Sequence, residues 1–200
     1  MYFDKNLFNE FLNQREVTWL GIDFSRATYT KDGFDLPSDI LHYYFNEWNK
    51  MFILDQKKYN LRASFQKPIV SYDLKIVTKK NSIGKDKLNI KKHIIIENTI
   101  QEENLKEYVT QYNPLPSQTT FSIVFIVESL DHNLKAASVW VVILHNITKN
   151  IVLTEKFIER PKGLNTKTYW ARAFYNILFK INDLHFTQWT NFIKENPIET

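Results

Sequence analysis

Four carboxylates in or near the predicted strands are the residues best suited to acid–base chemistry. They are Asp23, Asp73, Glu97 and Glu128. Catalysis by paired carboxylates needs two of them in one deep pocket, because one donates a proton while the other accepts one. Their spacing along the chain does not show that any two converge, so we predict no catalytic residue. An enzyme that uses strand-end carboxylates is the least favoured of three functional hypotheses.

The segment GIDFSRA, residues 21–27, interrupts an apolar stretch with the charged residues Asp23 and Arg26. One interpretation makes them a partner-binding pair at the end of a strand. The other places them where the strand emerges into solvent, which is the commoner position for charged residues. Ser25 lies between them, but it has no glycine elbow around it and does not predict a nucleophilic serine.

Metal and cofactor chemistry leaves no recognisable pattern in this chain. Five histidines are scattered without an HxH, HExxH or i,i+4 pair. There is no cysteine, which removes a disulfide framework, a zinc–thiolate site and a cysteine nucleophile. Only four glycines are present, and their spacing forms no phosphate-binding loop. We therefore predict no metal and no cofactor.

A lysine-rich segment is the second feature with chemical meaning. Between Lys75 and His93 there are seven lysines, one aspartate and no aromatic residue, and residues 79–92 are expected to form a loop. Such a segment suits electrostatic binding to nucleic acid or to an anionic lipid surface. The alternative is a solvated loop whose charges oppose aggregation. The candidate anion-binding residues are Lys79, Lys80, Lys85, Lys87, Lys91 and Lys92.

Periodicity predicts the elements that would position these side chains. Alternating or continuous apolar runs predict strands at residues 17–29, 69–80, 119–130, 136–147 and 151–160. Helical spacing predicts helices at residues 4–14, 38–53, 101–111, 166–181 and about 185–195. The last three strands are separated by DHNLK and TKN, which are lengths that suit hairpins. The order predicts a single α+β domain over residues 1–200, with helices packed on a five-stranded mixed or antiparallel sheet that ends in a three-stranded meander.

The helix predicted at residues 166–181 has one wide apolar face. From Trp170 to Ile181 its apolar residues recur at helical spacing, so packing against the core explains them. Tyr169 and Arg172 fall on the other side of this helix. They are the second pair of candidate partner-binding residues, because an aromatic ring beside a guanidinium group forms a stacking surface.

Composition favours a binding protein over an enzyme. Aromatic residues make up 15% of the chain, and a surplus of Trp and Tyr beyond the needs of one core would leave an apolar patch typical of an interface. The leading hypothesis is a non-enzymatic protein that binds a protein partner, as a component or accessory of a multiprotein or envelope assembly. The alternative is the electrostatic binder of nucleic acid or anionic lipid.

The N-terminal sequence bears on localisation. MYFDKNLFNEFLNQREV has no basic start followed by an apolar run and a cleavage site, so it predicts no secretory signal. No stretch of the sequence is apolar for long enough to predict a spanning helix. These features predict a cytoplasmic protein, whereas prior removal of a leader would place it in the periplasm or envelope.

Several stretches together resemble a family of uncharacterised bacterial proteins from Bacteroidetes. They are VTWLGIDFSRATYT, YYFNEWNKMFILDQKKYNLRASF and the run from IVFIVESLD to TYWARAFYNIL, and they cover most of residues 17–181. The closing Gly-x-Gly of the family pattern is reduced here to Gly163. The resemblance implies no catalytic residue, because the family has no established activity. The order of elements is also similar to the N-terminal domain of TolB and to envelope auxiliary lipoproteins.

Overall fold

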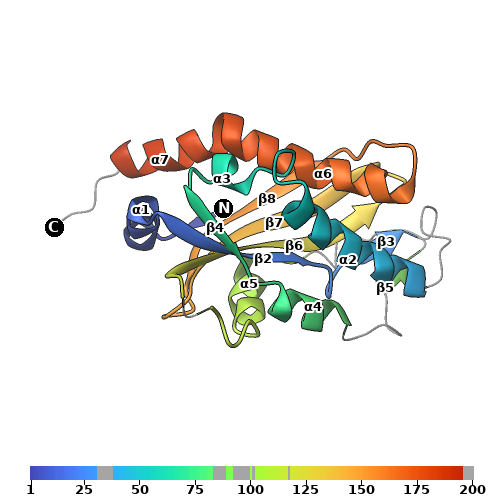
Figure 1. The fold of residues 1–200 in the computed structure, drawn as a ribbon, viewed down its shortest axis with the longest axis horizontal. Coiled ribbons are helices and arrows are strands. Elements are labelled where there is room, and N and C mark those ends of the chain that lie inside the picture. The colour runs from blue at the N-terminus through green and yellow to red at the C-terminus, as the bar shows by residue number, and fades with distance from the viewer. Residues whose placement is uncertain (31–37, 83–88, 92–99, 101, 117, 196–200) are drawn as a thin grey trace.

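The computed structural model describes residues 1–30, 38–82, 89–91, 100, 102–116 and 118–195. Within these residues one mixed sheet runs through the middle of the molecule, with helices on both faces (Figure 1). The predicted α+β class, with helices packed on a mixed sheet, is therefore confirmed. The described strands are β1 (Tyr2–Phe3), β2 (Glu16–Asp23), β3 (Thr28–Thr30), β4 (Ile69–Tyr72), β5 (Asn89–Lys91), β6 (Phe121–Asp131), β7 (Ala136–His145) and β8 (Ile151–Glu159).

The antiparallel meander β6-β7-β8 forms one side of this sheet, as predicted. The main strand order is β1-β8-β7-β6-β2-β4, so β6 and β7 lie in the interior. Their nearly continuous apolar sequences fit this position, because both faces of each strand are buried. Strand β2 is parallel to both β6 and β4. Further along the same edge of β6, β3 pairs in parallel with β6 and β5 pairs with β3.

The larger core lies on the face of the sheet that is uppermost in Figure 1. Five helices contribute to it: α1 (Lys5–Asn13), α2 (Ser38–Leu54), α3 (Leu61–Ser64), α6 (Thr166–Lys180) and α7 (Phe186–Glu195). Its centre is aromatic, with the ring of Trp19 stacked on Phe52 at 4.9 Å and edge-on to Phe125 at 4.9 Å. Helix α6 buries Trp170 and Phe174 there, which is the apolar face that its spacing predicts.

A five-residue π-helical segment, η2 (Ile181–His185), joins α6 to α7. One side chain from this segment and one from α7 contact Glu155 of β8. The ring nitrogen Nδ1 of His185 lies 3.0 Å from Oε1 of Glu155, and Nε1 of Trp189 donates to Oε2 at 2.6 Å. Because η2 leaves no gap between them, α6 and α7 continue one another along the sheet (Figure 1). None of the helices within the described residues is long and apolar enough to cross a membrane.

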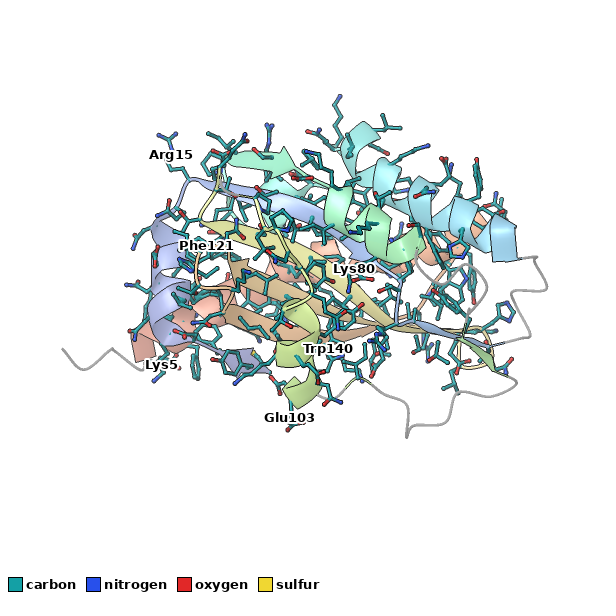
Figure 2. The ribbon with its side chains drawn as sticks, turned by 90° about the horizontal axis from the view of Figure 1, so that it is seen from below. Lys5, Arg15, Lys80, Glu103, Phe121 and Trp140 are labelled. Carbon is teal, nitrogen blue, oxygen red and sulfur yellow. The ribbon has the colours of Figure 1, made fainter. Side chains whose placement is uncertain are left out.

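The smaller core lies on the opposite face, beneath two short helices. Helices α4 (Lys75–Ser82) and α5 (Glu102–Val109) cover it, and Figure 2 looks at the molecule from this side. Val77 and Leu105 from these helices belong to the same buried cluster as Leu20 and Val124 from the sheet. This face carries the candidate site, because the carboxyl end of β2 projects Asp23 toward α4 and α5.

Two predicted strands differ from the structure. The strand expected at residues 17–29 stops at Asp23 and resumes at Thr28. The strand expected at residues 69–80 ends at Tyr72, and helix α4 follows. Asp73 starts that helix, since its Oδ1 accepts the N–H of Lys75 at 3.2 Å. The short apolar run fits both the strand period and the helix period. In the structure it is helical, and Val77 on the inner side of α4 is buried against the sheet.

The lysine-rich segment is also not a loop throughout. Residues 79–82 belong to the last turn of α4, and residues 89–91 form β5 beside β3. Lys79 and Lys80 are therefore helical residues. Lys85, Lys87 and Lys92, together with Glu97, lie outside the described residues, and so does the side chain of Lys91.

Candidate functional site

The site is built where β2 breaks its regular pairing. A bulge at Gly21 shifts the register between β2 and β6. The φ of Gly21 is +111°, a conformation that glycine adopts and that other residues avoid. A Cβ at this position would lie only 2.5 Å from Oδ1 of Asn49 on α2. Glycine therefore allows helix α2 to approach the strand closely here.

Two asparagine side chains take the place of a neighbouring strand beyond the bulge. Strand β4 ends opposite Trp19, so it supplies no partner for the backbone of Ile22 and Phe24. Asn49 accepts the N–H of Ile22 at 2.7 Å and donates to its carbonyl at 3.0 Å. Asn81 on α4 accepts the N–H of Phe24 at 2.7 Å and also donates to the carbonyl of Ile22 at 3.0 Å. These buried amides tie α2 and α4 to the end of β2.

Asp23 is the centre of a buried polar cluster. Its Oδ1 accepts from the backbone N–H of Ser25 at 2.8 Å and from the Ser25 hydroxyl at 2.7 Å. Its Oδ2 accepts from the hydroxyls of Tyr108 at 3.0 Å and Tyr112 at 2.5 Å. The Nζ of Lys80 lies 3.8 Å from the same oxygen. These partners compensate the cost of removing a carboxylate from water.

Lys80 links helix α4 to the C-terminal end of α5. Its ammonium group lies 4.2 Å from the centre of the Tyr108 ring and 5.0 Å from that of Tyr112. It also donates to Oε1 of Gln111 at 3.1 Å. Figure 2 shows Lys80 between the two helices. Burial lowers the pKa of Lys80, and the negative charge of Asp23 opposes that change.

Both tyrosines act as hydrogen-bond donors to the carboxylate. Burial raises the pKa of Tyr108 and of Tyr112, and the charge of Asp23 raises both further. They therefore keep their protons at neutral pH. Donors thus surround both oxygens of Asp23, which makes this carboxylate an anchor for α4 and α5 rather than a base that meets a substrate.

A cavity of about 1250 Å³ opens beside this cluster. It extends from the β2–β3 turn, where Ser25 and Arg26 line it, along α4 toward Tyr72 and Leu115. Its polar end is formed by Ser25, Arg26 and Lys80. Asp23 lies behind Ser25 and is fully buried.

The walls of the cavity carry a positive surplus. In the described part of the chain, four basic side chains line it, and the nearby carboxylates are Asp73 on the wall and Asp23 behind it. Basic side chains that converge on a concave surface raise the local potential and attract anions. The basic lining residues are Arg26, Lys75, Lys79 and Lys80.

The structure separates the two charged residues of the DFSRA segment. Asp23 has no exposed surface, so the interpretation that it emerges into solvent is wrong. Arg26 is exposed and faces the cavity, with its guanidinium carbon 5.7 Å from the centre of the Tyr108 ring. The two residues therefore have different environments, and Arg26 is the one that can reach a ligand.

Of the other predicted site residues, Lys79 and Lys80 line the cavity. Tyr169 and Arg172 on α6 do not line it. The ring of Tyr169 faces the ring of His132 at 5.7 Å. The guanidinium of Arg172 lies 4.7 Å from the centre of the Tyr175 ring. Tyr169 and Arg172 thus contact different partners and do not form one stacking surface.

Among the described carboxylates considered for catalysis, Asp73 lines the cavity and Glu128 does not. Glu128 accepts from the Ser138 hydroxyl at 2.5 Å and forms an ion pair with Nζ of Lys156 at 2.5 Å. In the part of the chain that the structure describes, no group of three or more His, Asp or Glu residues could hold a metal ion.

Sequence reasoning missed Asn49, Asn81, Tyr108 and Tyr112 as parts of the site. The two asparagines carry no local signal, because their role depends on a strand edge that forms only in the folded protein. Tyr108 lies in the last turn of α5 and Tyr112 follows the helix, so no spacing along the sequence marks the two rings as a pair.

Comparison with known proteins found no matching family model, no similar curated protein and no similar solved structure. The resemblance to a Bacteroidetes family and the similarity to TolB therefore stay predictions. The function must be argued from the geometry of the site.

Proposed function

We propose that this protein binds a small anionic molecule in the cavity beside α4. The observation that carries this proposal is the convergence of Arg26, Lys79 and Lys80 on one concave wall. Arg26 comes from the β2–β3 turn and the two lysines come from α4, so tertiary packing brings together cations that are distant in the sequence.

The surroundings of the cationic wall support binding. Lys80 is fixed by Gln111 and by the faces of two tyrosine rings, which reduces the side-chain entropy that a ligand would have to remove. The exposed guanidinium of Arg26 lies at the same end of the cavity. Ammonium and guanidinium groups are donors that recognise phosphate and carboxylate oxygens.

The arrangement of the carboxylates favours anion binding over catalysis at this site. The oxygens of Asp23 are already occupied by Ser25, Tyr108 and Tyr112, and a general base must reach the proton that it removes. Asp73 is the only carboxylate among the described residues that line the cavity. The proposal is therefore an anion-binding protein rather than a carboxylate-dependent enzyme.

The test is titration calorimetry with inorganic pyrophosphate at about 50 and 200 mM NaCl, because added salt screens exposed charges. We expect binding that weakens as salt rises. Arg26→Gln and Lys79→Gln should each weaken binding by about threefold to fivefold, which corresponds to less than about 1 kcal/mol per exposed charge. The matched control is Lys57→Gln, an exposed lysine outside the cavity lining.

Two results would reject the proposal. One is the absence of pyrophosphate binding at either salt concentration. The other is an equal loss of affinity in Lys57→Gln, which would indicate general charge attraction instead of a defined site.

Binding to a protein partner stays a prediction. The most exposed large apolar side chains in the described residues are Leu54, Leu134, Ile147 and Leu164. They lie at the end of α2, in the turns after β6 and β7, and in the loop before α6. Such a distribution over separate turns and helix ends favours no particular interface.

A further inference from the structure

The cavity has two chemically different ends. At one end Arg26 and Lys80 present two cations. Further along the wall, Ile76 and Leu115 line the cavity and pack against the smaller core. Because Ile76 and Lys80 are spaced i,i+4 on α4, they lie on the same side of the helix, about 6 Å apart along its axis.

The charge of the whole cavity wall decides between classes of anion. Among the described residues, four basic side chains line the cavity, while one carboxylate lines it and another lies behind it, which leaves a surplus of two positive charges. A phosphate monoester carries about −1.5 to −2 at neutral pH. A single carboxylate carries only one negative charge and would leave part of the surplus uncompensated.

We propose that the ligand is a small organic phosphate whose phosphate group binds at Arg26 and Lys80, while an apolar body lies against Ile76 and Leu115. This inference rests on the proposed function and adds the ligand class and its orientation. The distance of one helical turn between the two ends fits a body of a few carbon atoms attached directly to the phosphate.

The experiment compares four probes by titration calorimetry: inorganic phosphate, hexyl phosphate, hexanoate and hexan-1-ol. Hexyl phosphate should bind at least about tenfold tighter than inorganic phosphate, because each methylene removed from water adds about fourfold in affinity. Hexanoate should bind more weakly than hexyl phosphate, and hexan-1-ol should not bind measurably.

Two variants assign the ends of the cavity. Leu115→Ser should remove most of the advantage of hexyl phosphate over inorganic phosphate while leaving the affinity for inorganic phosphate unchanged. Arg26→Gln should weaken both phosphates by a similar factor. Each variant must show the circular dichroism spectrum and cooperative thermal unfolding of the parent protein before it is used.

The outcomes separate this inference from the proposed function. Binding of pyrophosphate and inorganic phosphate without any gain from the hexyl chain would overturn the two-ended orientation and leave anion binding intact. Tighter binding of hexanoate than of hexyl phosphate would overturn the phosphate assignment. A gain for hexyl phosphate that Leu115→Ser does not reduce would also overturn the orientation.

Vesicles that contain phosphatidic acid test whether the phosphate belongs to a soluble molecule or to a lipid, because the headgroup of this lipid is also a phosphate monoester. We expect binding to soluble hexyl phosphate and no sedimentation with these vesicles, because the polar end includes the partly buried Ser25 and Lys80. Sedimentation that Arg26→Gln abolishes would overturn the assignment to a soluble ligand.

Discussion

The hydroxyl of Tyr112 donates to Oδ2 of Asp23 across 2.5 Å, and both side chains are fully buried. This contact joins the segment after α5 to the end of β2, which are 89 residues apart in the sequence. It lies directly behind Ser25 and Lys80, which line the cavity. The stability of this end of the sheet and the shape of the cavity therefore depend on the same cluster.

Tyr112→Phe should lower the free energy of unfolding by about 1.5–3 kcal/mol, because a hydrogen bond to a charged group is lost in a buried place. Urea unfolding followed by tryptophan fluorescence measures the change. The control is Tyr43→Phe, since Tyr43 is 55% exposed and its hydroxyl reaches water. An equal effect of the two substitutions would contradict the anchoring role of Tyr112.

Asp23→Asn should cost more, about 3–5 kcal/mol, because it leaves the partly buried Lys80 without its counter-charge and places an amide among hydrogen-bond donors. The double-mutant cycle with Lys80→Met tests this reason. If the two charges interact, the double variant should lose less stability than the sum of the single losses. Strict additivity would show that the 3.8 Å contact contributes nothing.

Asn81→Ala should destabilise the protein by about 2–4 kcal/mol, because it removes the partner of the Phe24 N–H and one partner of the Ile22 carbonyl. Hydrogen exchange gives a local measurement. The amide of Phe24 should exchange faster in the variant, while amides in the middle of β7 keep their protection relative to global unfolding. Unchanged exchange at Phe24 would show that this hydrogen bond is not made in solution.

A pH dependence follows from Lys67, a buried lysine whose ammonium group donates to carbonyls at the C-terminal end of α1, among them Gln14 at 2.9 Å. Burial lowers the pKa of Lys67 to about 8 from 10.5. Between these values the unfolded chain holds a proton that the folded chain has released, so stability rises with pH in this window. Below about pH 8 both states are protonated and this contribution is constant.

The slope should be about half of 1.4 kcal/mol per pH unit at pH 8 and roughly 1 kcal/mol per pH unit at pH 9 to 9.5, because the folded chain is only half deprotonated at its pKa. Lys67→Met should abolish it, and the comparison of the two proteins cancels contributions from other groups. Urea unfolding at pH 7, 8, 9 and 9.5 provides the measurement. A variant with the same rise as the parent would assign the slope to another residue.

The sequence by itself carried the parts of the fold that depend on local patterning. The meander was predictable because three long runs rich in apolar residues, joined by the short linkers DHNLK and TKN, have few alternatives to antiparallel strands. The apolar face of α6 was predictable for a similar reason, since a wide stripe at helical spacing must be buried. The class of the fold follows from these elements and their order.

Short segments were decided by tertiary contacts. The run after Tyr72 satisfies both the strand and the helix period, and its outcome depends on Val77 reaching the core beneath α4. The break after Asp23 depends on the bulge at Gly21 and on amides supplied by α2 and α4. A pattern in one segment contains no information about such distant partners.

The site shows the same division. The sequence marked Asp23 and Arg26 as unusual and gave the lysines of α4 a possible role with anions. It could not tell that the carboxylate turns inward to two tyrosines while the guanidinium faces a cavity. Burying a charge is favourable only where several donors converge on it, and that convergence exists only after the β2 end, α4 and α5 have packed together.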